Sequence, residues 1–262
     1  MIRKLNIALI GCGNWGKNIA RNLHEMGALA CVYDLNLKLS EKLNYKYKLP
    51  NFELNKIFKD KNIDALVLAS SAITHKDLAL EAIKNNKDLF IEKPFCLSLP
   101  DAQILSELAS KKRRVLMVGH LLNYHNAFVK MRELIQNGKI GILKNIRAHR
   151  LSLGAIRSCE SVVYDLSAHD ISMILSITNE MPHNVKVQSI HHNANIGPDA
   201  VSVKLSFSDG VTAIINSDWM CPYKEHKFST IGTKGSLIFD DTKTWSEKLY
   251  YNPSFITSEN YI

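Results

Sequence analysis

The chain has 262 residues, enough to bury one large hydrophobic core or two smaller ones. A hydrophobic fraction of 46% and a charged fraction of 22% are close to globular averages, so the composition excludes a disordered or fibrous protein. The formal net charge of +8 comes from scattered residues, and its one short cluster, at residues 111–114, is typical of a solvated helix end rather than of a nucleic-acid contact.

The first half of the sequence alternates between strand and helix patterns. Short apolar runs predict strands at residues 5–10, 29–33, 63–69, 89–91 and 115–119. Helical patterns lie between them at residues 15–26, 78–83 and 100–110. This alternation is typical of a doubly wound parallel sheet, so we predict an α/β Rossmann domain over residues 1–122.

The second half contains mostly strands. After a helix pattern at residues 128–136, strand patterns occur at residues 143–151, 185–192, 200–207, 211–219, 227–231 and 236–240. Ser208-Asp209-Gly210 is a hairpin turn signal, and one further helix pattern covers residues 169–177. We therefore predict an α+β domain with a largely antiparallel open sheet over residues 123–262.

Several predicted strands carry apolar side chains on both alternating sets of residues, namely Val201, Val203, Leu205, Ile214 and Ile215. Because a large exposed apolar face usually marks an interface, we expect the sheet of the second domain to pair with another copy of the chain.

Cysteine usage and the absence of targeting patterns predict the compartment. The five cysteines are widely spaced and form no CxxC pair, which argues against a disulfide framework and against a zinc site. The N-terminus lacks a secretory pattern, and no apolar run reaches the roughly 20 residues needed to cross a bilayer. We expect a cytoplasmic protein with no membrane, nucleic-acid or metal partner.

The segment Gly11-Cys12-Gly13-Asn14-Trp15-Gly16 matches the dinucleotide pattern GxGxxG between a predicted strand and a predicted helix. The glycines allow a tight turn, a close approach of backbone to pyrophosphate, and close packing of helix on strand. Asp34 closes the next predicted strand, 18 residues after Gly16, where it can accept both ribose hydroxyls of NAD and would repel the 2′-phosphate of NADP. The pattern predicts NAD as cofactor.

Two other segments carry titratable groups. Lys93, in Glu92-Lys93-Pro94, follows a predicted strand at the carboxyl edge of the sheet, where ligands bind in open α/β folds. Asp165 and His169 are four residues apart and share one face if their segment is helical, and an imidazole suits the removal of a hydroxyl proton. Taken singly, these segments are better explained as a surface lysine and a polar helix start.

Together, these motifs occur in the order and at roughly the intervals of the Gfo/Idh/MocA dehydrogenases, which the chain resembles to about residue 251. Thr74-His75, after the Ser70-Ser71 strand end, is similar to the family's Thr-His pair, and residues 119–125 resemble its Gly-His segment. Residues 219–241, with Gly-Thr-Lys-Gly at 232–235, resemble its late strands. The resemblance implies an NAD-dependent sugar dehydrogenase.

The resemblance also implies residue roles. Lys93 would hydrogen-bond the reacting hydroxyl, His169 would act as general base, and Asp165 would orient the substrate or the imidazole. Tyr124 and Arg157 would contact the substrate. Cofactor contacts would come from Gly11, Cys12, Gly13, Asn14, Trp15, Gly16, Asp34, Ser70, Thr74, His75, Glu92 and Lys93.

The segment 153–157 with the Asp-x-x-x-His-Asp motif looks most like family members that oxidise nucleotide-linked sugars, and free sugars or inositols come next. Family members typically continue with a further strand and a closing helix, which we expect this chain to lack. That departure keeps a second hypothesis open, a protein that binds NAD without turnover and acts as a sensor or is an inactive relative.

Overall fold

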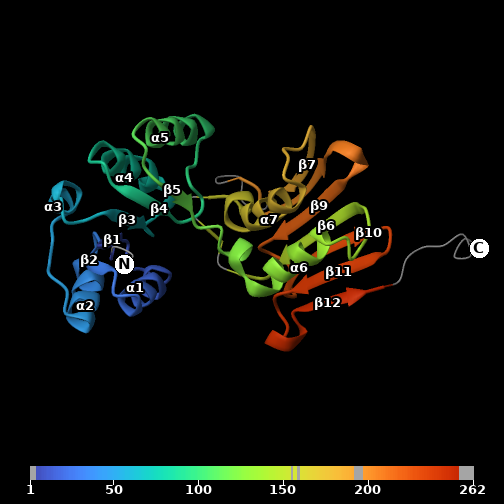
Figure 1. Ribbon diagram of the computed structural model, residues 1–262, viewed down its shortest axis with the longest axis horizontal. Helices are drawn as coiled ribbons and strands as arrows, with labels where there is room; N and C mark the ends of the chain where they lie inside the picture. Colours follow the sequence, from blue (N-terminus) through green and yellow to red (C-terminus); the bar gives the residue numbers. More distant parts are fainter. Residues whose placement is uncertain (1–3, 155, 158–159, 192–196, 254–262) are drawn as a thin grey trace, which may run out of the picture. The chain divides into compact units, whose positions relative to one another are not determined.

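The computed structural model describes residues 4–154, 156–157, 160–191 and 197–253 (Figure 1). The chain divides into two units, residues 1–119 and 120–262. Each unit has a sheet of its own, and each is described separately below.

The first unit has a five-stranded sheet in the order β2-β1-β3-β4-β5, and every neighbouring pair is parallel. The strands are β1 (Ile7–Ile10), β2 (Leu29–Tyr33), β3 (Ala65–Leu68), β4 (Asp88–Ile91) and β5 (Leu116–Val118). The strand order reverses at β1, which makes the carboxyl ends of β1 and β3 the switch point where α/β sheets bind ligands. The predicted Rossmann sheet is confirmed.

Helices cover both faces of this sheet. They are α1 (Gly16–Glu25), α2 (Leu37–Tyr47), α3 (Leu54–Lys59), α4 (Ala72–Lys84) and α5 (Leu99–Lys111). Leu9 of β1 packs in one core with Leu23 of α1, whereas its neighbour Ile10 packs in a second core with Ile83 of α4. Successive strand residues point to opposite faces, so a short continuous apolar run fills both cores.

The second unit has a seven-stranded sheet in the order β12-β11-β10-β6-β9-β8-β7. The strands are β6 (Leu143–Leu151), β7 (Asn184–Ile190), β8 (Ala200–Ser206), β9 (Thr212–Asp218), β10 (Glu225–Gly232), β11 (Gly235–Asp240) and β12 (Leu249–Asn252). All pairs are antiparallel except β6 with β9, which is parallel. This confirms the largely antiparallel sheet, and the predicted turn at residues 208–210 joins β8 to β9.

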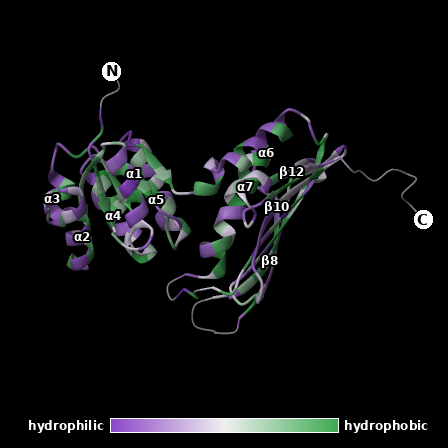
Figure 2. Ribbon diagram, turned by 90° about the horizontal axis from the view of Figure 1, so that it is seen from below, coloured by the Kyte–Doolittle hydropathy of each residue, from purple (hydrophilic) through white to green (hydrophobic). Residues whose placement is uncertain are grey.

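Two helices, α6 (Asn126–Gln136) and α7 (Ala168–Thr178), lie along one face of this sheet (Figure 2). Phe128 and Met131 of α6 and Met173 and Ile174 of α7 pack into a single core with the strands. Within the described part of the chain, no helix is both long and apolar enough to cross a lipid bilayer.

The prediction that apolar residues occupy both faces of this sheet needs correction. Val201, Val203, Leu205 and Ile215 are all buried in the helix-covered core, and of the five residues cited only Ile214 belongs to the other alternating set. On β8 that other set is Ala200, Ser202, Lys204 and Ser206. The open face is therefore mixed rather than broadly apolar, because the strand period of two sends the branched residues to the helices.

The helix-covered face ends in a line of polar residues that we call the polar row: Ser217, Arg150, His226 and Asp241. Arg150 of β6 is paired with Ser217 of β9 on one side and with His226 of β10 on the other. The backbone N–H of Asp241 donates to the carbonyl of His226 at 2.9 Å. These strand positions share the alternating set of the core residues, so the polar row borders the hydrophobic core directly.

Candidate active site

The glycine loop follows β1 and leads into α1. Gly11 has φ +102°, and a Cβ there would lie 2.4 Å from the backbone carbon of Ala69, so both its conformation and its contact with the end of β3 require glycine. A Cβ at Gly16 would lie 2.0 Å from the Gly11 carbonyl oxygen. A Cβ at Gly13, in contrast, would meet no atom within 4 Å.

The open space at Gly13 suits a ligand rather than the fold. The Trp15 side chain makes no capping hydrogen bond at the start of α1, where the N–H groups of Lys17 and Asn18 donate to the carbonyls of Gly13 and Trp15. The positive end of the helix dipole at this terminus favours an anion. A backbone that allows close approach beside a helix N-terminus fits the pyrophosphate of a dinucleotide.

Asp34 directly follows β2 and its carboxylate binds the glycine loop. One carboxylate oxygen accepts from the backbone N–H of Cys12 at 2.7 Å, and the other accepts from the N–H of Asn36 at 2.8 Å. Each oxygen keeps lone pairs for further donors. Burial and the charge of Asp34 raise the pKa of the Cys12 thiol to about 12, so Cys12 contributes through its backbone and not as a thiolate.

A pocket of about 220 Å³ opens beside Asp34 at the carboxyl ends of β1, β2 and β3. Its walls are mainly apolar and include Leu35, Leu54 and Leu78, with Ser70, Ser71 and Thr74 on another side. Apolar walls next to a carboxylate fit an adenosine group, with the base between the leucines and the ribose hydroxyls on Asp34. Leu35, the second residue after β2, is 81% exposed, and sequence reasoning did not identify it as a candidate cofactor contact.

The loop after β3 is held by hydroxyl bonds and by a buried histidine. The hydroxyls of Ser70 and Thr74 lie 2.7 Å apart. The ring of His75 is 1% exposed, with Nδ1 2.9 Å from the Pro94 carbonyl oxygen and Nε2 3.1 Å from that of Ser70. Burial lowers the pKa of His75. The ring thus joins the segments that follow β3 and β4, and the cofactor contact that the resemblance implies for His75 stays a prediction.

Glu92 and Lys93 lie at the end of β4. Trp15 Nε1 donates to Glu92 Oε1 at 2.7 Å, which ties the glycine loop to the Glu-Lys-Pro segment. Burial raises the pKa of the Glu92 carboxyl, although this hydrogen bond opposes the shift. Lys93 is half-buried and precedes the buried Pro94. The structure therefore brings the predicted residues of the first unit to one sheet edge.

In the second unit, Asp165 lies in a π-helical turn, Val163–Ser167, that runs directly into α7. π-Helical turns are rare overall but frequent at functional sites, and because of this turn Asp165 and His169 are not both on the α-helix that the shared-face argument required. Asp165 is buried, and its Oδ2 accepts from Trp219 Nε1 at 3.1 Å and lies 3.4 Å from Arg157 Nε. His169 is half-buried in the first turn of α7.

Sequence reasoning missed the residues that hold this segment on the sheet. Ser167 Oγ donates to Ser217 Oγ at 2.9 Å. Arg150 donates to Asp170 through Nε at 3.0 Å and through Nη2 at 2.9 Å, and both side chains are buried. A signal was available in the sequence, because Arg150 lies on the same alternating set of β6 as Ile146 and Ala148.

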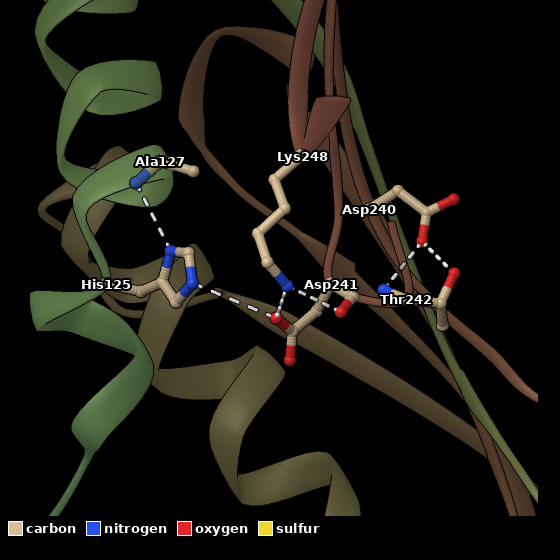
Figure 3. Close-up of polar contacts among 6 residues, drawn as sticks. All are labelled: His125, Ala127, Asp240, Asp241, Thr242 and Lys248. Atoms are coloured by element: carbon tan, nitrogen blue, oxygen red, sulfur yellow. Dashed lines mark hydrogen bonds and ion pairs between the residues drawn. The ribbon is translucent and has the colours of Figure 1, made fainter. Parts of the chain in front are cut away.

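Tyr124 ends a short 3₁₀ turn, Leu121–Tyr124, and is 65% exposed. The next residue, His125, caps α6 by accepting from Ala127 N–H at Nδ1, 3.2 Å away (Figure 3). His125 Nε2 lies 3.8 Å from Asp241 Oδ1, which also pairs with Lys248 Nζ at 2.6 Å (Figure 3). Burial lowers the pKa of His125 more than Asp241 raises it. A neutral His125 therefore holds the turn that presents Tyr124.

Two protein-family models match the chain. The model described as the oxidoreductase family with an NAD-binding Rossmann fold matches residues 5–120, and the GFO/IDH/MocA C-terminal domain matches residues 128–238. Both agree with the predicted resemblance, and the first agrees with the predicted cofactor.

Individual curated relatives share less than 30% sequence identity with this chain. The chain is 28% identical to myo-inositol 2-dehydrogenase of Thermotoga maritima over 258 residues, which are 91% of this chain and 76% of that enzyme. It is 25% identical to 2,7-anhydro-N-acetylneuraminate hydratase of Escherichia coli over 257 residues, 92% of this chain and 68% of the hydratase.

Among solved structures, UDP-N-acetylglucosamine 3-dehydrogenase GnnA of Acidithiobacillus ferrooxidans matches with a TM-score of 0.85 at 22% identity, covering 96% of this chain and 81% of GnnA. GenD2 from gentamicin A biosynthesis, solved in complex with NAD, also has a TM-score of 0.85 at 22% identity and covers 97% of this chain and 82% of GenD2. At this identity the likeness supports the fold.

Proposed function

Because the chain belongs to the Gfo/Idh/MocA family of NAD-binding oxidoreductases, we propose that it oxidises a secondary hydroxyl of a sugar or polyol and prefers NAD to NADP. The observation that carries the cofactor preference is the Asp34 carboxylate, which borders the pocket at the end of β2. A 2′-phosphate in this position would meet a like charge, whereas two ribose hydroxyls would each find an acceptor.

The residues around the glycine loop would hold the cofactor. The open backbone at Gly13 and the start of α1 would take the pyrophosphate, and Asp34 would take the adenosine ribose. Ser70 and Thr74 would border the cofactor from the loop after β3, while Glu92 would hold Trp15 of the loop in place. NAD supplies a hydride acceptor when bound.

Side chains of the protein would bind the reacting hydroxyl and accept its proton. Lys93 would donate a hydrogen bond to the reacting hydroxyl oxygen, and the imidazole of His169 would accept the hydroxyl proton. Asp165, held by Trp219 and Arg157, would orient the substrate or the imidazole. Arg157, which is exposed, and Tyr124 would contact the substrate.

For the substrate we propose a nucleotide-linked sugar, with inositols as the second candidate. The segment around residues 153–157 favours the first, and the GnnA likeness is compatible with it. The second is favoured by the inositol dehydrogenases among the relatives. Arg157 would distinguish the two classes by binding phosphate through its guanidinium, because a nucleotide-linked sugar carries phosphate groups and an inositol carries none.

The test mixes the protein with NAD and each candidate and follows absorbance at the reduced-nicotinamide band. Turnover of nucleotide-linked sugars, reduced at least 10-fold in Arg157→Ala, is the expected result. Turnover of inositols alone, with none of nucleotide-linked sugars, would assign the second substrate class. NAD binding with no turnover of any candidate would favour the sensor hypothesis over catalysis.

We also propose that the protein is cytoplasmic and associates with itself. The four cysteines that the structure describes are free thiols, which suits a reducing compartment. On the open face of the second sheet, Ile214, Ile231 and Ile238 belong to the set opposite the helices. Light scattering of Ile214→Lys beside the unaltered chain tests this, and a monomeric unaltered chain at micromolar concentration would contradict it.

A further inference from the structure

The start of α7 is fastened to the sheet by three polar contacts made at residues 165, 167 and 170. Asp165 binds Trp219 after β9, Ser167 binds Ser217 of β9, and Asp170 binds Arg150 of β6. His169 lies among these contacts, directly before Asp170. Asp165 and Ser167 make two of these contacts from within the π turn, and Asp170 makes the third from the first turn of α7.

The Arg150–Asp170 contact differs from the other two because it joins two buried charges. It is bidentate, and the two side chains are 9% and 1% exposed. Two parallel N–H···O bonds define direction as well as distance, so they restrict rotation of Asp170 in a way that a hydroxyl pair does not. Apolar side chains would pack here at less cost in desolvation, which makes the pair unusual as a device for stability alone.

The surroundings maintain the charge on Arg150. Burial by itself would lower the pKa of Arg150, but the charges of Asp170, Asp241 and Asp165 outweigh it and the pKa is raised. Beside Arg150 in the polar row, burial and the Arg150 charge lower the pKa of His226. Arg150 is thus the permanent cation of this row, and Asp170 is its bidentate partner.

We propose that Arg150 is a positioning residue for the reaction, and that its bidentate hold on Asp170 sets the place of the neighbouring His169 imidazole. The proposal rests on the proposed function, in which His169 accepts the hydroxyl proton. A misplacement of about 1 Å in a reacting group can cost on the order of 100-fold in rate. The position of His169 therefore matters more for turnover than the stability of the pair does.

The decisive variants separate geometry from charge. Arg150→Lys keeps the positive charge and removes the planar fork. The double variant Arg150→Met/Asp170→Leu removes both charges and leaves neither partner unpaired, a replacement that often preserves or raises stability. Ile146→Val, in the same strand and core, is the control for a small loss of packing.

Each variant is assayed for thermal melting, NAD affinity, kcat, KM and the pH dependence of kcat. We expect kcat to fall about 10- to 100-fold in Arg150→Lys and in the double variant, with the Kd for NAD within 2-fold, because the cofactor residues are in the first unit. In Arg150→Lys the kcat should fall with little movement of the pH profile, since the positive charge at position 150 is retained. Ile146→Val should keep kcat within 2-fold.

A folded double variant or a folded Arg150→Lys with kcat within 3-fold of the unaltered protein would overturn the proposal. A double variant that does not fold would also overturn it, because the pair would then serve the fold. If the unaltered protein turns over a sugar or polyol and these variants do as well, only this inference fails. If the unaltered protein turns over none, the proposed function fails and removes the basis of this inference with it.

Discussion

Replacing Asp34 with serine should weaken NAD binding about 5- to 150-fold. The carboxylate ends β2 at the edge of the 220 Å³ pocket, and its two oxygens already accept from Cys12 and Asn36 N–H groups. Losing the acceptors of two ribose hydroxyls costs about 1–3 kcal/mol, and each 1.4 kcal/mol is a factor of ten in affinity. Asn36 is exposed but Cys12 is buried, so the substitution also removes an acceptor from the fold, and thermal melting establishes that the variant is folded before binding is compared.

The same substitution should change cofactor preference. With the negative charge removed, repulsion of a 2′-phosphate disappears, so the Kd for NADP should stay the same or fall while that for NAD rises. Titration calorimetry with both cofactors measures the two constants on one preparation. Glu107→Ala, an exposed carboxylate on α5, is the matched control and should leave both constants unchanged.

The reasoning would be refuted by a Kd for NAD within 2-fold of the unaltered protein in folded Asp34→Ser. A preference of the unaltered protein for NADP would refute it as well. In either case the carboxylate would be serving the Cys12 and Asn36 backbone groups alone, and the pocket beside it would need another ligand.

Three further results are expected. His169→Ala should lower kcat about 100- to 10,000-fold with an unchanged Kd for NAD, and Lys93→Met should lower kcat similarly and also raise KM, because Lys93 would bind the substrate hydroxyl. Gly13→Val should leave the melting temperature within about 2 °C and weaken NAD at least 10-fold, since its Cβ meets no protein atom, whereas Gly16→Val should destabilise the fold, since its Cβ would lie 2.0 Å from a carbonyl oxygen. His125→Asn should make stability less dependent on pH between 7.5 and 5.5, measured by urea unfolding.

The sign of the last effect follows from the buried ring. The pKa of His125 is lowered in the folded protein, so below the unfolded-state value of about 6.5 the unfolded chain binds more protons. Stability contributed by the neutral ring is therefore present above about pH 6.5 and is lost as pH falls. Asparagine keeps an acceptor at the start of α6 and cannot titrate. An equal loss of stability in both proteins would contradict this account of His125.

The catalytic prediction and the glycine prediction each have an outcome that would contradict them. An active preparation that tolerates both His169→Ala and Lys93→Met would remove the catalytic assignment. Unchanged NAD affinity in Gly13→Val would mean that the open space at this glycine is not where pyrophosphate binds.

Short-range patterns in the sequence were sufficient for most elements and for the nucleotide loop. β2 and β6 begin and end where the sequence predicts, because each is an apolar or alternating run bounded by turn residues. The loop could be predicted because its three glycines and Asp34 are local requirements of backbone space and charge. Helices α2 and α3 were missed, since each buries only two or three residues and has little apolar periodicity.

Only the tertiary structure decided which faces are covered and which polar residues meet. The sequence left open which alternating set faces the helices, and in the structure Val203 and Ile215, paired across β8 and β9, both lie in the helix-covered core. The parallel pairing of β6 with β9 aligns Arg150 with Ser217, which is 67 positions later in the sequence, and α7 then brings Asp170 onto Arg150. No local pattern encodes such contacts, because they depend on sheet order and register, which are set by long-range packing.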